Sequence, residues 1–248
     1  MISKARIKDI KALQMPKFRQ IYNKFVAEGD KVCIEFLKSS KYEVENIYIT
    51  FESQNKYHIP KTHLSKLEII SAKEMEQISR LKTPSDIVLV LDQREEDLLL
   101  MSQPNTSAIY LDGVQDPGNV GTIIRLADWF GISAVIRSVD SADFFNPKVV
   151  QASMGSMSNV ALIQAELSAL QHLKKEIVGT FLEGTSVFAT SIPADAILVL
   201  GSEGKGIRPE NITHITQKIS IPGAKNKVAE SLNVSVAAGI IAGVWKTK

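Results

Sequence analysis

Residues 116–131 read DPGNVGTIIRLADWFG, and this stretch predicts a tight turn followed by a helix. Pro117 presets φ for the turn and Gly118 accepts a positive φ, while Asn119 can cap the helix that follows. Apolar residues then recur at helical spacing, so one face of the helix belongs to a core. Gly131 is expected to end the helix.

Arg125 lies on that helix among apolar neighbours. The residues just before the turn, 108–114, form a short apolar strand, so the helix leaves a sheet. In open α/β sheets, ligands bind at the edge beyond the C-termini of the strands. Arg125 is therefore a candidate functional residue, and the alternative is an arginine held in a structural salt bridge.

Strands and helices alternate through the rest of this half of the chain. Further apolar strands are expected at 133–139, 177–182, 196–201 and 218–223. Helices are expected from Asn146-Pro147 onward, over 166–175 and over 233–245. Such alternation predicts a mostly parallel sheet with helices on both faces, an α/β fold.

The first part of the chain is predicted to be a separate small α/β domain, residues 1–100. Helices are expected over 15–37 and over 71–81, where Ser71 and Glu74 have the spacing of a capping box. Strands are expected at 46–50 and 86–91, and 102–107 (SQPNTS) is the expected linker to a second domain, 107–248.

Basic residues gather near the start of the chain. The span 4–41 contains ten lysines and arginines against four acidic residues, a net charge of +6. Such a block suits a polyanion such as RNA, and it equally suits a solvated helical surface. The ten are Lys4, Arg6, Lys8, Lys11, Lys17, Arg19, Lys24, Lys31, Lys38 and Lys41.

The composition is that of a globular protein, with 44% hydrophobic and 23% charged residues among 248. The opening residues contain no apolar run, so no signal peptide is expected. The longest apolar stretch near the end, 234–245, is shorter than the roughly 20 residues of a membrane span. The single cysteine, Cys33, excludes an internal disulfide and suits a reducing cytoplasm; its apolar neighbours predict a packed thiol.

Several kinds of site are absent from the sequence. GSEGKGI (201–207) lacks the spacing of a P-loop, and no dinucleotide fingerprint follows the strand at 108–114. The four histidines and one cysteine make no zinc-ligand pattern, so no metal is expected. Instead, three glycine-rich or polar segments each follow an apolar strand. Backbone there can approach a ligand closely and offer free N–H and C=O groups.

These three segments together resemble the SpoU branch of the SPOUT superfamily, S-adenosylmethionine-dependent RNA ribose 2′-O-methyltransferases. The matching residues are DPGNVGTIIR (116–125), GSEGKG (201–206), and Ile221-Pro222 with SLNVSVA (231–237). The segments 25–37 and 81–91 also resemble the small α/β substrate-binding domain that precedes the catalytic domain in many members. The resemblance implies a parallel-sheet domain with a deep trefoil knot, working as a homodimer.

The resemblance also implies roles for particular residues. Backbone at Gly201, Ile221 and Leu232 would hold S-adenosylmethionine in the knot. The implied catalytic residues are Arg125, Glu203, Ser231 and Asn233, with Glu203 ordering its loop through hydrogen bonds to backbone or to an arginine. Asn119 and Lys148 would contact RNA. One departure lies at Gln151, where many members have an arginine, and this weakens the expectation of an RNA or dimer contact there.

The role of Arg125 is open between general base and phosphate clamp. A guanidinium stays protonated below a pKa of about 12, which favours a clamp that also steadies the developing alkoxide. Family dimers could supply this arginine from the partner protomer.

The expected function is methyl transfer to a ribose 2′-hydroxyl of RNA. The two-domain layout favours ribosomal RNA, and transfer RNA is the alternative. Two other classes are a non-catalytic RNA-binding protein on the same scaffold and a small-molecule methyltransferase. The basic block argues against a small substrate. No DNA or membrane partner is expected.

Overall fold

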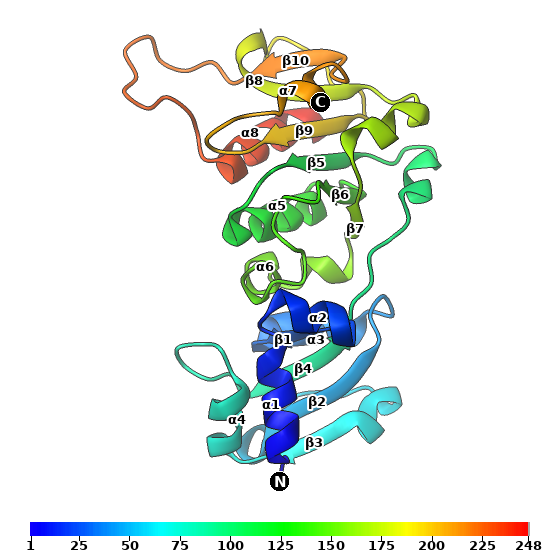
Figure 1. Cartoon of the computed structure of the whole chain (residues 1–248), viewed down its shortest axis with the longest axis vertical. Helices are drawn as coiled ribbons and strands as arrows, with labels where there is room; N and C mark the ends of the chain where they lie inside the picture. The colour runs from blue at the N-terminus through cyan, green and yellow to red at the C-terminus, as the bar shows by residue number, and fades with distance from the viewer. Residues whose placement is uncertain (248) are drawn as a thin grey trace. The chain divides into compact units, whose positions relative to one another are not determined.

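The computed structural model describes residues 1–247, and the chain forms two compact units (Figure 1). The first unit contains Met1–Arg94 together with Asp143–Asn159. The second contains Glu95–Ala142 and the chain from Val160 onward. Each unit has its own sheet and its own apolar core.

A four-stranded mixed sheet in the order β1-β4-β2-β3 forms the centre of the first unit. β4 runs antiparallel to both of its neighbours, whereas β2 and β3 are parallel. The strands are β1 (Lys24–Glu28), β2 (Val44–Thr50), β3 (Leu67–Ile70) and β4 (Ile87–Asp92). The helices are α1 (Lys4–Ala12), α2 (Pro16–Tyr22), α3 (Asp30–Lys38), α4 (Ala72–Ile78) and α6 (Pro147–Ser153), with 3-10 turns η1 (Phe51–Ser53), η2 (Lys61–Lys66) and η4 (Ser156–Ser158).

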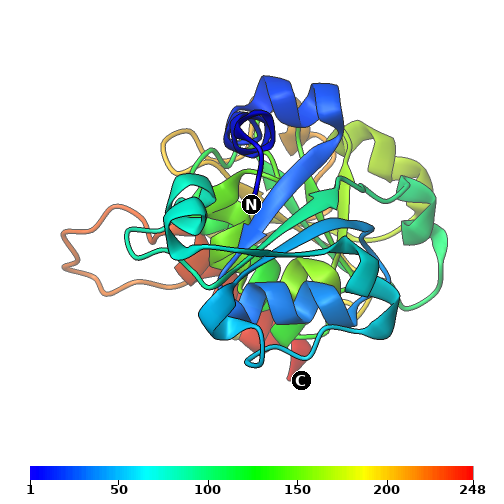
Figure 2. The ribbon, with the colours of Figure 1, turned by 90° about the horizontal axis from the view of Figure 1, so that it is seen from below.

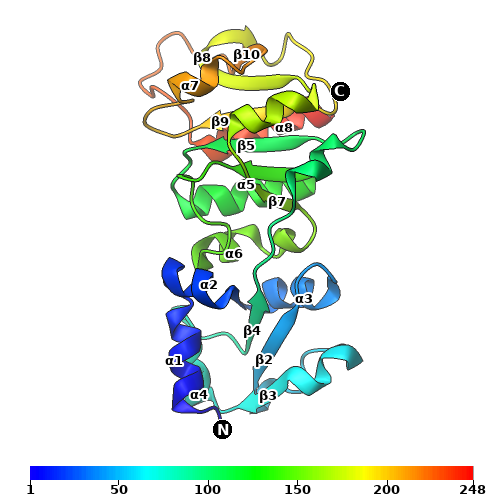
Figure 3. The same ribbon diagram turned by 45° about the vertical axis from the view of Figure 1, so that its right-hand side comes forward.

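Helices cover both faces of this sheet. Figure 3 shows α1 and α4 on one face and α3 on the other. Ile10 of α1 and Met75 of α4 pack against Tyr48 and Val88, whose side chains point to that face. Cys33 of α3 is fully buried on the other side, where desolvation, reinforced by Glu28 and Asp30, raises the pKa of its thiol well above the usual value. The packed thiol expected for Cys33 is confirmed.

Two helix predictions for this unit need correction. The stretch 15–37 is not helical throughout, because β1 lies inside it and pairs with β4. Phe25 and Ala27 are buried on alternate positions, a strand pattern too short to separate from the flanking helices by periodicity. The capping box at Ser71 is present, but its helix ends at Ile78 rather than near 81, because Ser79 has extended backbone angles.

The segment Asp143–Asn159 packs into the first unit, although it lies far along the sequence from the rest of it. Asp143 accepts hydrogen bonds from the guanidinium of Arg19, which is 1% exposed, at 2.5 and 3.0 Å. The ring of Phe145 lies 5.0 Å from that of Phe25, centroid to centroid. Asp143–Asn159 therefore contributes apolar side chains and a carboxylate to the core of this unit.

The second unit contains a six-stranded sheet in the order β10-β8-β9-β5-β6-β7, and every pair in it is parallel. The α/β fold with a parallel sheet is confirmed; the trefoil knot stays a prediction. The strands are β5 (Ala108–Asp112), β6 (Ala134–Arg137), β7 (Ala161–Gln164), β8 (Ile177–Ser186), β9 (Ile197–Gly201) and β10 (Gln217–Ser220). The helices are α5 (Pro117–Trp129), α7 (Pro209–Ile212) and α8 (Val234–Lys246), with 3-10 turns η3 (Leu98–Ser102) and η5 (Leu167–Leu173).

Three details of this unit differ from the sequence predictions. β7 was not expected, and a 3-10 turn stands where a helix over 166–175 was predicted. Asp116, not Asn119, caps α5: its carboxylate accepts the backbone N–H of Asn119 at 2.8 Å, and Pro117 occupies the first turn. Asn119 is thereby inside the helix, with its side chain free for other contacts. Gly131, with φ of +65°, follows the end of the helix as predicted.

α5 and α8 pack against each other in the second unit (Figure 1). A β-carbon added at Gly239 would lie 3.7 Å from Leu126, and one at Gly243 would lie 3.8 Å from Phe130. The small residues of α8 thus face α5 of the same chain. No helix among residues 1–247 has the length and apolar character needed to cross a bilayer.

Candidate active site

The three motif segments all start at one edge of the parallel sheet. β5, β9 and β10 end at Asp112, Gly201 and Ser220, and the segments 116–125, 201–206 and 221–237 follow directly. Because the carboxyl ends of parallel strands share an edge, all three segments meet there. The expected placement of the motifs at this edge is confirmed.

Asn119 joins the three motifs through its side-chain amide. Its Nδ2 donates to Oε1 of Glu203 at 2.6 Å, and its Oδ1 accepts from Nδ2 of Asn233 at 3.0 Å. The carboxylate can only accept, so it fixes which way the amide of Asn119 points. Glu203 is ordered by this amide and not, as expected, by backbone or an arginine.

Asn233 has a second duty at the start of α8. Its Oδ1 accepts the backbone N–H groups of Ser235 and Val236, at 2.9 and 3.3 Å, and also the hydroxyl of Ser235. The hydrogen-bonded series Glu203–Asn119–Asn233, which we call the polar seam, therefore links the second motif to the first turn of α8. Its members lie 84 and 114 residues apart in sequence.

Arg125 is exposed on α5 and makes no hydrogen bond or ion pair with any described residue, 1–247. The alternative of a structural salt bridge within the chain is therefore wrong. A guanidinium without an internal partner is available to a phosphate, a carboxylate or a partner chain.

Ser231, Leu232 and Ile221 lie on the loop between β10 and α8. Figure 2 shows this loop, in orange, extending away from the sheet. Its internal backbone pairing is a single bond, from the N–H of Lys227 to Ala224 at 3.4 Å. The backbone groups of Ile221 and Leu232 make no hydrogen bond within residues 1–247, and Leu232 is 48% exposed. Free donors and acceptors beside apolar side chains suit a ligand with both polar and apolar parts.

Gly201 is required by the turn that follows β9. Ser202 and Gly206 exchange two backbone hydrogen bonds, at 3.1 and 2.9 Å, which fold the loop tightly back on itself. A β-carbon at Gly201 would lie only 2.1 Å from the carbonyl carbon of Gly206. No other residue fits at position 201 without opening the loop.

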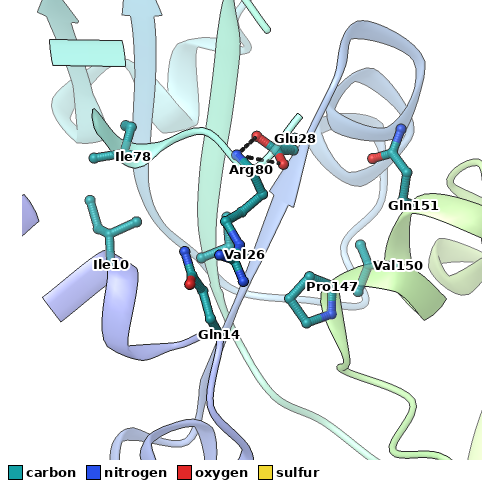
Figure 4. Close-up of a pocket in the computed structure, with 9 residues that line it drawn as sticks. All are labelled: Ile10, Gln14, Val26, Glu28, Ile78, Arg80, Pro147, Val150 and Gln151. Atoms are coloured by element: carbon teal, nitrogen blue, oxygen red, sulfur yellow. Dashed lines mark hydrogen bonds between the residues drawn. The ribbon is translucent and has the colours of Figure 1, made fainter. Parts of the chain in front are cut away.

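Lys148 and Gln151 belong to the first unit, on α6, and the structure does not bring them to the polar seam within the second unit. Gln151 borders a small hollow whose lining Figure 4 shows. Glu28 in this hollow accepts the backbone N–H of Arg80 at 3.0 Å and the hydroxyl of Ser79 at 2.9 Å. The hollow is thus partly polar.

A buried ionic group beside the motifs was missed from the sequence. The carboxylate of Asp112, fully buried, accepts from the backbone N–H and the Nε of Arg208, at 2.8 and 2.6 Å, and from Nδ2 of Asn211 at 2.9 Å. Burial opposes the charge on Arg208, but its hydrogen bond to Asp112 outweighs this, so the pKa of Arg208 lies above its usual value. An acidic residue at the end of an apolar strand was the available signal.

Comparison with known proteins agrees with this geometry. The model of the SpoU rRNA Methylase family matches residues 106–243, more than half of the chain. The chain belongs to the SpoU rRNA methylase family. Residues 4–89 match the MRM3-like substrate binding domain. The family expected from the three motifs is confirmed.

Relatives extend over most of the chain. The 23S rRNA (guanosine(2553)-2′-O)-methyltransferase RlmP of Bacillus subtilis is 30% identical over 243 residues, covering 95% of this chain and 94% of its own. The 23S rRNA (guanosine-2′-O-)-methyltransferase RlmB of Pasteurella multocida is 36% identical over 157 residues, covering 60% of this chain and 63% of its own.

Solved structures agree over the same length. An AdoMet-bound rRNA methyltransferase from Sinorhizobium meliloti superposes with a TM-score of 0.85 at 26% identity, covering 98% of this chain and 95% of the other. A structure assigned to the TrmH family of RNA methyltransferases, from Porphyromonas gingivalis, gives a TM-score of 0.86 at 36% identity, covering 99% and 98%.

Proposed function

We propose that this protein transfers the methyl group of S-adenosylmethionine to a ribose 2′-hydroxyl of a guanosine in 23S ribosomal RNA. The observation that carries the proposal is the polar seam, in which Asn119 joins the three family motifs at the ligand-binding edge of the sheet. The similarity to RlmP over nearly the whole chain supports a ribosomal RNA substrate.

S-adenosylmethionine suits the loop that leads to the seam. The unpaired backbone groups of Ile221 and Leu232, with Gly201 at the end of β9, would hold its polar parts. When bound, it supplies a methyl group on a sulfonium, which an oxygen nucleophile can displace. Ser231 and Asn233 would border the place where this methyl group and the ribose meet.

Arg125 would bind the RNA beside the reacting ribose. Its guanidinium stays charged at neutral pH and can hold a phosphate with two parallel hydrogen bonds. The 2′-hydroxyl loses its proton as its oxygen forms the new bond, and the positive charge of Arg125 stabilises the alkoxide that develops. Placement of the ribose supplies the remaining rate enhancement.

The test is a map of the modified nucleotide. The protein and labelled S-adenosylmethionine are incubated with 23S rRNA, 16S rRNA or total tRNA, and resistance of single linkages to alkaline hydrolysis locates 2′-O-methyl groups. One modified guanosine in 23S rRNA is expected, and Arg125→Ala serves as the inactive control. Methylation of tRNA alone would replace the proposed substrate with the alternative. RNA binding without S-adenosylmethionine binding in calorimetry would indicate a non-catalytic scaffold.

The structure divides the basic block into paired and free charges. Arg6 bonds Glu45 and Tyr48, Arg19 is buried against Asp143, and Lys24 lies 2.5 Å from Glu45. Lys38 pairs with Glu35, and Lys41 donates to the carbonyl of Met157. The exposed lysines that make no ion pair within residues 1–247 are Lys4, Lys8, Lys11, Lys17 and Lys31.

Lys4, Lys8 and Lys11 form one stripe on α1. At 3.6 residues per turn they fall within an arc of roughly 60°, and Asp9 lies outside it. The guanidinium of Arg80, also without an ion pair in the described chain, lies beside Gln14 just past the end of α1 (Figure 4). This lysine stripe is the surface of the first unit that we assign to the RNA backbone.

Replacing the lysine stripe by glutamine (Lys4→Gln, Lys8→Gln, Lys11→Gln) should weaken RNA binding. Each lost phosphate contact releases fewer counterions, so the slope of log K against log salt should shrink by about 2. Filter binding at several salt concentrations measures this slope. Arg6 is left intact, because its charge is consumed by Glu45.

A matched control lies on the opposite face of the same sheet. Lys31→Gln, Lys38→Gln and Lys61→Gln remove the same charge from α3 and η2 (Figure 3). This triple variant should keep the salt slope of the native protein. Equal slopes for the two triple variants would refute the assignment of the stripe.

A homodimer is part of the proposal. Trp129 on α5 is 82% exposed and Val236 on α8 is 51% exposed, a large apolar surface for two helices that carry Arg125 and Asn233. A second copy would cover these side chains. We place the reaction in the cytoplasm, where ribosomal RNA is found and a lone thiol such as Cys33 stays reduced.

A further inference from the structure

Asp112 lies at the end of β5 and touches both ends of the loop that follows β9. Through its backbone it pairs in register with Gly201, where the loop begins. Through its carboxylate it accepts the backbone N–H and the Nε of Arg208, just after the loop ends. A single residue therefore spans the base of the loop 201–208.

A buried carboxylate is costly to fold unless strong donors surround it. Asp112 is fully buried and has three donors, one of them from a guanidinium. The third donor is Asn211 on α7, at 2.9 Å, and Asn211 itself is 4% exposed. These bonds fix the backbone at Arg208 and the first turn of α7, because losing any of them leaves charge buried without a partner.

The loop held in this way is short and has little freedom to adjust. Ser202 and Gly206 pair through two backbone bonds, and a β-carbon at Gly201 would collide with the carbonyl carbon of Gly206. At its tip, Glu203 reaches Asn119 at 2.6 Å. A shift at Arg208 would therefore move the tip of the loop and lengthen the bond between Glu203 and Asn119.

We propose that Asp112 is a positioning residue that, through Arg208 and Asn211, holds the Gly201–Gly206 loop in its ligand-binding shape. We call these three residues the loop clamp. The inference rests on the proposed function, since that function makes this loop part of the cofactor site. Asp112 is buried behind the loop and acts only through it, so no contact with substrate is required.

Asp112→Asn tests the clamp because it keeps the size of the side chain and removes its charge. The affinity for S-adenosylmethionine, measured by calorimetry, should fall by about 10- to 100-fold, the range of a charge-assisted hydrogen bond. In steady-state kinetics, KM for S-adenosylmethionine should rise, while KM for RNA stays near the native value. Arg208→Lys keeps the charge but loses the geometry of the Nε donor, so a smaller loss of cofactor affinity is expected.

The matched control is a buried cation at the other edge of the same sheet. The ammonium of Lys175, 7% exposed, donates to the carbonyl of Thr106 at 2.8 Å and lies 3.4 Å from Asp195. These residues precede the first residues of β8, β5 and β9, far from the loop. Lys175→Gln should lower the melting temperature and leave cofactor affinity unchanged.

Several outcomes would overturn the inference. Unchanged cofactor affinity in folded Asp112→Asn is one, and an equal loss in Lys175→Gln is another, because general destabilisation would then explain both. If Asp112→Asn does not fold, Arg208→Gln, whose native side chain is 26% exposed, takes its place with the same criteria. Failure of the native protein to bind S-adenosylmethionine would instead count against the proposed function.

Discussion

At the scale of single residues, the bridging amide of Asn119 decides how the motifs meet. Asn119→Asp should place two carboxylates against each other at Glu203, so methyl transfer should fall by about 10²-fold or more, with unchanged unfolding by urea. Thr122→Ala, an exposed change on the same helix, is the control and should keep native activity. Native activity in Asn119→Asp would show that the seam is not needed. The motifs named Glu203 and Asn233 from sequence, but local patterns carry no information on contacts 84 or 114 residues apart.

At the scale of elements, α8 lies on α5 through its small residues, so bulk there acts within the chain rather than at a dimer surface. Ala238 is fully buried, and Ala238→Leu should lower the free energy of unfolding by about 1–3 kcal/mol in urea titrations. Gly239→Ala should raise it by about 0.5–1 kcal/mol, because the added methyl meets Leu126 at an ordinary 3.7 Å and the helix loses a flexible residue. A loss of stability in Gly239→Ala would contradict this packing. Periodicity predicted both helices; it missed β1, whose strand character depends on pairing with β4 some sixty residues later.

At the scale of the whole molecule, a shared site in a homodimer predicts complementation. Arg125→Ala protomers are mixed with Asn233→Asp protomers, a change that keeps an oxygen to cap α8. If Arg125 acts across the interface, hybrids regain one complete site and part of the activity; no recovery, with hybrids seen by mass spectrometry, would place both residues in one protomer. Alternating strands and helices predicted the parallel sheet. They could not predict that 143–159 packs with the first unit, because that follows from the burial of Phe145 and Arg19.

The path of the chain limits how this architecture can be taken apart. The polypeptide passes between the units three times, near residues 94, 142 and 159, so a single protease cut at any one of them leaves the halves tethered. A fragment cut at 102–107 would lack the segment that supplies Asp143 to the buried Arg19 and Phe145 to the aromatic cluster around Phe25. The substrate-binding unit is consequently no exchangeable cassette: grafting it onto another catalytic unit requires carrying its seventeen-residue inset as well.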